Sequence, residues 1–335
     1  MTTAMLIQWV VISALIIVSL LTGFAYLTLL ERRVLARIQV RIGPNRAGPF
    51  GLLQPVADGL KLFFKEELIP AQADRVIFVL APVVTLVPAL IILAVVPLGP
   101  PIELFGQTIT LGLAPDINVG VLYLMAVSSI SVYGIVLAGW SSNNKYSLLG
   151  ALRSSAQMIS YELALGLAFI GPILIAGSMS LQDIVDAQAS RWYILYQPIG
   201  FVVFVLAAIA EVNRAPFDMP EAEQELTAGY HSEYSGMKFA LLFMAEYDKM
   251  IAVSAIAATL FLGGYHGPFI AEAPLLGPLY LGGKVVLLLL LMIWLRATLP
   301  RFRYDRLMAF GWKVLLPLAL LNVALTAVGV VMWGG

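Results

Sequence analysis

The sequence predicts an all-α, polytopic membrane protein with eight transmembrane helices and one amphipathic helix at the membrane interface. Three observations support this. Of the 335 residues, 60% are hydrophobic and only 12% are charged, with a mean hydropathy of +0.91, whereas a soluble domain is about half apolar and about a quarter charged. Long apolar runs recur along the chain. Positively charged residues gather between alternate runs.

Eight apolar segments are long enough to cross the hydrocarbon core, which takes about 20 helical residues. Continuous runs of this length are helices, because a spanning segment in lipid must satisfy its own backbone hydrogen bonds. No repeat of fixed period is evident, so residues 1–335 are expected to form a single transmembrane domain. The predicted spans cover residues 5–30, 76–97, 118–140, 155–177, 192–211, 239–263, 279–299 and 312–333.

The basic residues set the expected orientation of these spans. They lie mainly in the odd-numbered loops, at about residues 31–75, 141–154, 212–238 and 300–311. The even-numbered loops carry only Arg191 and Lys284, at their edges. Because positively charged loops stay on the cytoplasmic side, the odd loops should be cytoplasmic and both termini outside. The N-terminal segment lacks a basic start and a cleavage site, so it is expected to be a retained span.

Composition also excludes several kinds of site. There are no cysteines, which excludes disulfides and Cys-ligated iron–sulfur or zinc centres in this chain. The two histidines, His231 and His266, fall in different loops, which argues against a bis-histidine haem. The formal net charge of zero argues against a nucleic-acid partner. We therefore expect no metal and no cofactor bound by this chain.

The first odd loop combines a basic helix face with an amphipathic segment. Arg33, Arg37 and Arg41 recur every four residues, which places them on one face of a helix. The stretch GPNRAGPFG then breaks the helix, and an apolar stripe opposite a polar face predicts an interfacial helix. The basic residues could equally serve only to orient the chain and contact anionic lipid. A nucleotide site is disfavoured, because the glycines lack the order of a P-loop.

Two acidic residues, Glu162 and Glu246, lie about seven residues inside predicted spans, at a depth of about 10 Å. A charge at that depth costs at least about 2.5 kcal/mol and usually belongs to an ion or proton pathway. The alternative is a structural ion pair, in which Glu246 would pair with Lys249 or Lys238 and Asp248 with Lys249.

Residues 211–239, EVNRAPFDMPEAEQELTAGYHSEYSGMKF, concentrate carboxylates between two apolar segments. A run of charges is usually solvated. The interleaved apolar and aromatic residues instead favour packing against protein, which would place the acids in a partly dry polar cavity. Arg214 and the basic first loop are the natural counter-ions. Two possibilities stay open here, a proton or ion pathway and a docking surface for partner subunits. The six acids are Glu211, Asp218, Glu221, Glu223, Glu225 and Glu233.

Three strings carry a resemblance to a known family: ERRVLARIQVRIGPNRAGPFGLLQPVADGLKLFFKE, EVNRAPFDMPEAEQELTAGYHSEYSGMKFALLFMAEY and RATLPRFRYDRLM. They resemble the H-type membrane subunit of the proton-pumping NADH:quinone oxidoreductase, respiratory complex I, and its mitochondrial homologue. The resemblance covers essentially the whole chain. A homologous subunit of a membrane-bound hydrogenase, or of a complex with another electron donor, stays open as an alternative.

The resemblance implies an integral subunit of a translocase in the bacterial cytoplasmic membrane, with no complete active site in this chain alone. Such a subunit forms the chamber that quinone enters and joins the peripheral arm to the membrane arm. Its implied partners are the quinone-site subunits of the peripheral arm, the small membrane subunits leading to the antiporter-like subunits, quinone and membrane lipids. FMN and the iron–sulfur clusters would sit on partner subunits. Ubiquinone and menaquinone are not distinguished.

The resemblance also implies roles for individual residues, none of them catalytic or metal-ligating. The quinone cavity would involve Glu31, Arg37, Arg41, Arg46, Lys65, Arg214, Asp218, Glu221, Glu223 and Glu225. The proton pathway would involve Glu162, Glu233 and Glu246. Two rival interpretations are a stand-alone transporter or channel, which also uses intramembrane acids, and a structural anchor whose charges only dock a soluble arm.

Overall fold

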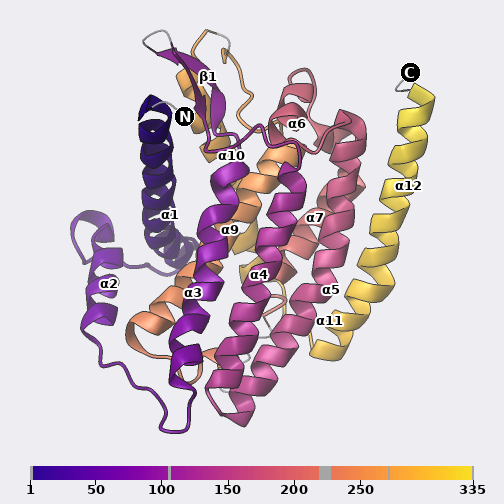
Figure 1. Ribbon diagram of the computed structural model, residues 1–335. Helices are drawn as coiled ribbons and strands as arrows, with labels where there is room; N and C mark the ends of the chain where they lie inside the picture. The colour runs from indigo at the N-terminus through magenta and orange to yellow at the C-terminus, as the bar shows by residue number, and fades with distance from the viewer. Residues whose placement is uncertain (1–2, 105–106, 219–227, 271, 334–335) are drawn as a thin grey trace.

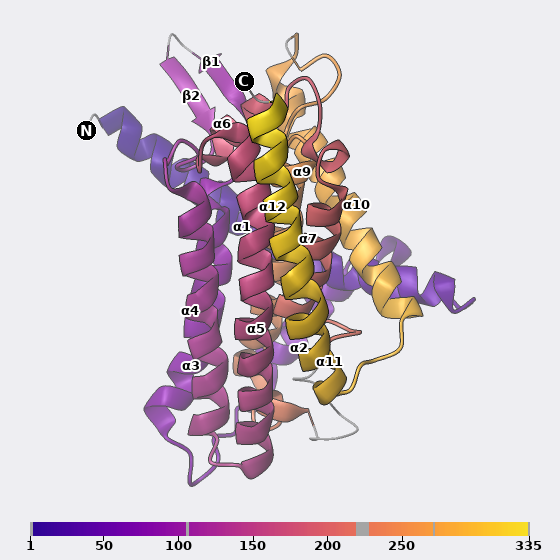
Figure 2. The ribbon, with the colours of Figure 1, turned by 90° about the vertical axis from the view of Figure 1, so that its right-hand side faces the viewer.

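The computed structural model describes residues 3–104, 107–218, 228–270 and 272–333, which are mainly helical. Among the described residues, seven long helices and the shorter α7 make up the main bundle, and α1 crosses the others obliquely (Figures 1 and 2). They are α1 (Thr3–Ile38), α3 (Arg75–Ile91), α4 (Gly120–Ser141), α5 (Lys145–Ala176), α7 (Pro198–Glu211), α9 (Gly236–Phe261), α10 (Gly277–Thr298) and α12 (Leu316–Trp333). Shorter helices at the ends are α2 (Gln54–Phe64), α6 (Leu181–Ala187) and α11 (Tyr304–Phe310).

The two ends of the molecule differ in what they contain. At one end β1 (Gly99–Leu104) pairs antiparallel with β2 (Gln107–Leu111), beside α6 and both chain termini (Figure 1). We call this the hairpin end. The opposite end holds α2, the turn between α4 and α5, and α11 (Figure 1). We call it the basic end, because most of the odd-loop lysines and arginines lie there.

Within the described residues, six helical stretches are long and apolar enough to cross a membrane, which confirms a polytopic helical chain. They are Gln8–Ile38, Arg75–Val95, Gly120–Ser141, Lys145–Ala176, Pro274–Thr298 and Tyr304–Met332. The other two predicted spans differ for separate reasons. The first, 192–211, contains α7, which has only 14 residues because it begins at Pro198. The second, 239–263, matches α9, which has 26 residues but carries Glu246, Asp248 and Lys249.

Local sequence explains where several helices begin and end. The Asp74 carboxylate accepts hydrogen bonds from the backbone N–H groups of Val76 and Ile77, which caps α3. The Asn144 side chain caps α5 in the same way. At the other end of α5, Gly177 adopts a φ of 68°, a left-handed conformation that terminates the helix at little steric cost. A π-helical turn, Gly311–Leu315, joins α11 to α12.

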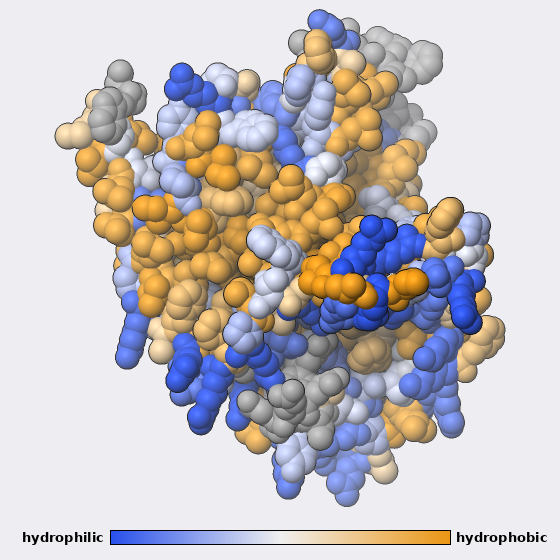
Figure 3. Space-filling view, turned by 180° about the vertical axis from the view of Figure 1, so that it is seen from behind, coloured by the Kyte–Doolittle hydropathy of each residue, from blue (hydrophilic) through white to orange (hydrophobic). Residues whose placement is uncertain are grey.

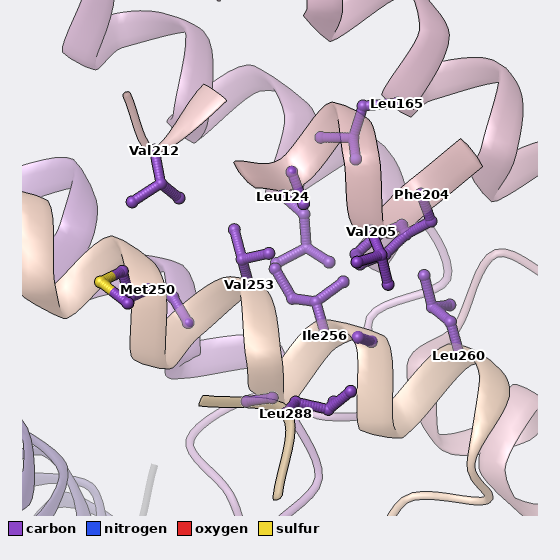
Figure 4. Packing of buried hydrophobic residues seen from close by; sticks show 14 of the residues in the cluster. Leu124, Leu165, Phe204, Val205, Val212, Met250, Val253, Ile256, Leu260 and Leu288 are labelled. Atoms are coloured by element: carbon purple, nitrogen blue, oxygen red, sulfur yellow. The ribbon is translucent and has the colours of Figure 1, made fainter. Parts of the chain in front are cut away.

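The core lies around α9, which contacts α1, α3, α7 and α10. Apolar side chains of several helices meet there, among them Leu124, Phe204, Val253 and Ile256 (Figure 4). Small residues allow close helix approach elsewhere, as expected in membrane bundles. A Cβ added at Gly134 of α4 would lie 2.1 Å from the Thr85 hydroxyl of α3. The outer surface shows a broad hydrophobic band with hydrophilic residues along its lower border (Figure 3).

Candidate functional site: a buried chain of charged residues

Three ionisable residues lie in the middle of α9, where a membrane helix would normally be apolar. Glu246, Asp248 and Lys249 are all buried. Glu246 and Lys249 are three residues apart, so they share one face of the helix, whereas Asp248 is rotated about 200° from Glu246. Neither carboxylate oxygen of Asp248 has a hydrogen-bond partner among the described residues. α9 therefore presents a mixed-charge face to the bundle interior.

Arg214 provides the first partner for that face. Its Nε lies 3.4 Å from Glu246 Oε1, and both side chains are buried. The guanidinium carbon lies 4.1 Å from the centre of the Tyr247 ring, a cation–π contact. Arg214 follows the end of α7, on a non-helical segment that is itself buried. Irregular backbone at this depth is tolerated only where protein surrounds it.

Tyr247 connects this pair to Glu31. Its hydroxyl donates a 2.6 Å hydrogen bond to Glu31 Oε2, and the other oxygen of Glu31 forms an ion pair with Arg296. Glu31 is buried in α1, and Arg296 lies in the last turn of α10. The contacts thus cross from α10 through α1 to α9. The family resemblance implied that Glu31 and Arg214 belong to the quinone cavity; the structure shows that both of them contact Tyr247.

Lys249 extends the arrangement toward α4 and α7. Its Nζ donates a 2.6 Å hydrogen bond to Ser131 Oγ, and its charge interacts with the carboxylates of Glu211, Glu246 and Glu162. Glu211 is the last residue of α7 and is buried, and its Oε2 has no hydrogen-bond partner among the described residues. We call the residues Arg296, Glu31, Arg214, Glu246, Lys249, Glu211 and Glu162 the charged chain.

Glu162 forms the far end of the charged chain. Ser129 of α4 donates a hydrogen bond to its Oε1, and the side chain is half-buried. Ser129 lies near Ser131, the partner of Lys249, so serines of one helix contact both an acid and the lysine. Nothing in the sequence singled out these serines, Glu211 as a buried group, or Lys249 as the centre of the cluster.

Small cavities accompany the charged chain. One of about 20 Å³ is lined by Ser128, Glu211 and Lys249, among others. Another of about 10 Å³ lies between Asn213 and Glu246, and it also borders Glu211 and Lys249. A cavity needs about 10–15 Å³ of such space to hold one water. The first cavity is therefore large enough for a single water molecule, and the second lies at the lower limit.

A separate pocket collects the basic residues of the first odd loop. It has a volume of about 470 Å³ and lies between the end of α1 and the turn that follows. Arg33, Arg37 and Arg41 line it, although α1 ends at Ile38 and Arg41 therefore lies beyond the helix face predicted for all three. Arg46 and Lys65 are exposed and do not line this pocket. Its positive charges favour an anionic or strongly dipolar ligand.

The other predicted site residues lie elsewhere. Glu233 borders a polar pocket at the basic end, and Asp218 is half-buried just after Phe217. Glu221, Glu223 and Glu225 fall outside the described residues. Within the part of the chain that the structure describes, no three histidine, aspartate or glutamate side chains are grouped as a metal site.

Comparison with known proteins assigns the family. A family model for NADH dehydrogenase matches residues 11–327. The H-type subunit of NADH-quinone oxidoreductase from Thermomicrobium roseum is 55% identical, over 95% of this chain and 97% of its own. One such subunit of Geobacter sulfurreducens is 54% identical, over 93% and 92%. NADH-quinone oxidoreductase subunit 8 of Thermus thermophilus is 53% identical, over 95% and 86%. With this identity along almost its full length, the chain belongs to the NADH dehydrogenase family of membrane subunits.

Proposed function

We propose that this chain is the subunit of an NADH:quinone oxidoreductase that forms the quinone chamber and couples quinone reduction to proton translocation. The names of its relatives support the enzyme. The charged chain carries the proposed coupling role, because it combines a buried and a partly buried ion pair with a lysine whose charge interacts with three carboxylates of the interior. The relatives' names favour this enzyme over a hydrogenase-type complex or a stand-alone transporter.

The basic pocket of Arg33, Arg37 and Arg41 is the proposed route of the quinone head group. We assign Arg46, Lys65 and the acids Asp218, Glu221, Glu223 and Glu225 to the rest of the chamber, together with partner subunits. Reduction of a quinone takes two electrons and two protons, and the electrons come from redox centres on the partners. The charge change at the head group then alters the protonation of nearby carboxylates.

The charged chain transmits that change. Acids that interact strongly titrate as a group, so a proton gained at one position shifts the proton affinity of the next. Lys249 stabilises whichever of Glu211, Glu246 or Glu162 is ionised, because it interacts with all three. Glu162 is the proposed exit toward small membrane subunits, since it is the half-buried end of the chain. Glu233 belongs to the same pathway.

The proposal includes a membrane topology and an orientation for the chain. We infer eight crossings in one transmembrane domain, with α7 and α9 completing the set, because both run inside the bundle between spanning helices. α2 is the proposed interfacial helix: Val56, Leu60 and Phe63 are exposed on one side, and Asp58 on the other pairs with Arg32 of α1 at 2.7 Å. By the positive-inside rule the basic end faces the cytoplasm of a bacterium and both termini face outward.

The test compares buried and exposed acids in the assembled complex. Glu211→Gln and Glu246→Gln should each lower coupled quinone reduction at least about tenfold, the lower range for loss of a proton-transfer group. Asp305→Asn is the matched control, because its side chain is exposed at the basic end. Wild-type turnover and proton-to-electron ratio in both buried variants would refute the coupling role. Ion flux through the purified chain alone in liposomes would instead support a stand-alone transporter.

A further inference from the structure

A second pocket at the basic end is not used by the proposed quinone chamber. It has a volume of about 590 Å³ and opens between the chain leading into α3 and the turn between α4 and α5. The side chains around it are mostly polar, unlike the arginine-lined pocket near α1. The lining residues are Pro70, Ala71, Gln72, Ser142, Asn143, Asn144, Lys145 and Glu233.

Glu233 is held at the inner side of this pocket. The amide nitrogen of Asn144 donates a 2.6 Å hydrogen bond to Glu233 Oε1, while the amide oxygen of Asn144 accepts from the backbone N–H of Tyr146. One asparagine therefore caps α5 and orients the carboxylate. The Lys145 ammonium lies 5.1 Å from the centre of the Tyr146 ring.

Next to the half-buried Glu233 in sequence, the exposed Ser232 begins a row of polar side chains that leads toward α5. The Ser232 and Ser147 hydroxyl oxygens are 2.8 Å apart, and Ser147 is fully buried. His231 and Tyr230 follow, both buried, with ring centres 3.9 Å apart. Tyr230 in turn lines the small cavity that also borders Glu211, Glu246 and Lys249.

This polar segment is fixed against α5 and α3. A Cβ at Gly150 of α5 would lie 2.7 Å from Gly229 Cα, so the two backbones are in close contact. Tyr234 stacks on Phe78 with ring centres 4.1 Å apart and donates to its carbonyl oxygen. Burial raises the pKa of Tyr234 to about 12, so this phenol stays protonated and serves as an anchor.

We propose that this pocket is a water-filled proton entrance from the cytoplasm, separate from the quinone chamber, which supplies Glu246 and Glu211 through Glu233, Ser232, Ser147, His231 and Tyr230. The inference rests on the proposed function and its orientation. Each relay group gains one proton on one side and releases one on the other, so it ends in its starting state. The arginine pocket is less suited to this task, because its positive field repels protons.

The first experiment uses variants of the assembled complex in membrane vesicles. Glu233→Gln should slow quinone reduction about tenfold, in the range expected for loss of a proton-transfer group. A small weak acid such as formate, supplied from the cytoplasmic side, should restore much of the rate, because it carries protons past the missing carboxylate. Glu233→Asp should retain most of the activity. A purely structural defect would not respond to formate.

The second experiment blocks the pocket directly, using the absence of cysteine from this chain. Gln72→Cys places a thiol in the pocket lining, and Arg303→Cys places one at an exposed position outside it. A membrane-impermeant methanethiosulfonate reagent should slow turnover of the first variant only, and thiol reductant should reverse the effect. The unsubstituted complex corrects for thiols on other subunits. Labelling of Gln72→Cys only from the opposite face would overturn the orientation.

The outcomes distinguish failure of the proton entrance from failure of the proposed coupling function. Normal turnover in Glu233→Gln with slow turnover in Glu211→Gln would overturn the entrance and leave the coupling role intact. Normal turnover in both would refute both. Slow turnover of Glu233→Gln without formate rescue, together with full activity of the labelled Gln72→Cys complex, would assign Glu233 a structural role.

Discussion

Helices α9 and α12 show how the surroundings of a helix decide its composition. α9 is enclosed by other helices, and its ionisable residues Glu246, Asp248 and Lys249 are all buried. α12 has no charged residue, and Leu320 and Leu325 are 52% and 55% exposed. In water the pattern would be reversed. Here protein supplies partners for charge, and lipid selects apolar side chains.

Even the polar residues of α12 turn away from the lipid side. Asn322 is buried, with its amide nitrogen close to Gly200 of α7. Thr326 accepts a 3.0 Å hydrogen bond from Gln197, the residue before α7. The two helices thus follow one rule: polar groups face protein. The difference lies in how much of each helix protein surrounds.

Removing a charge from the enclosed region should have the largest effect. Arg214→Met deletes the ion pair with Glu246 and the contact with Tyr247. Breaking a buried pair costs about 3–5 kcal/mol, so we expect little assembled complex in membranes, measured by native gel and quinone reductase activity. Adding Glu246→Gln to this variant should recover part of the assembly, although not coupling. Wild-type assembly of Arg214→Met would contradict the argument.

Adding a charge to the lipid-facing region should come next. Leu325→Lys places an ammonium on the exposed face of α12, at a cost of about 2.5–3.5 kcal/mol for a central position. The expected result is a reduced yield of inserted subunit, quantified by immunoblot of washed membranes. Leu325→Ala controls for the loss of the side chain and should insert normally. Equal yields for both variants would mean that a partner subunit, not lipid, covers this face.

Added methyl groups should also distinguish enclosed from open helix positions, but with a smaller loss of stability. Gly134→Ala forces a methyl group within 2.7 Å of the Thr85 backbone nitrogen, and overpacking of this kind costs about 1–3 kcal/mol. We expect a Tm several degrees lower for the complex in detergent. Gly282→Ala on α10 is the matched control, because no atom lies within 4 Å of the added Cβ. The comparison fails if both variants melt alike.

The smallest expected effect concerns a single hydrogen bond. Ser131→Ala removes the acceptor of Lys249, and such bonds contribute about 0.6 kcal/mol in membrane proteins. Stability should hardly change, but the pH profile of quinone reduction should shift. Without the serine, the Lys249 ammonium would move relative to the carboxylates with which its charge interacts, and their proton affinities would change. A Ser131→Thr variant retains the hydroxyl and should keep the original profile. An unchanged profile in Ser131→Ala would remove the serine from the pathway.

The sequence predicted the helical membrane class and most span positions, because long apolar runs carry that signal by themselves. It also pointed to Glu162 and Glu246, which lie in α5 and α9, as acids inside helices; their role as pathway residues stays a prediction. The contacts among distant segments were not predictable in the same way. The resemblance assigned Glu31 and Arg214 to the quinone cavity, and nothing local in the sequence shows that Tyr247 contacts both of them.

Glu211 illustrates the limit most clearly. The sequence placed it at the last position of the predicted span 192–211, directly before the loop at 212–238. In the structure α7 ends there, and the following Val212, Asn213 and Arg214 are also buried. A pattern of hydrophobicity cannot distinguish a helix that leaves the membrane from one that stops within the protein. That distinction depends on which neighbouring side chains form hydrogen bonds with the backbone groups left free at the end of the helix.

Gln157 of α5 forms hydrogen bonds with two of those backbone groups. Its amide nitrogen donates 2.7 Å hydrogen bonds to the carbonyl oxygens of Ala210 and Phe217, so one fully buried side chain fastens both ends of the bend after α7. Gln157 lies about 8 Å along the same helix from Glu162. The bend is therefore tied to α5, so that a displacement of Phe217, within the acidic stretch, would pull on the same helix that carries Glu162.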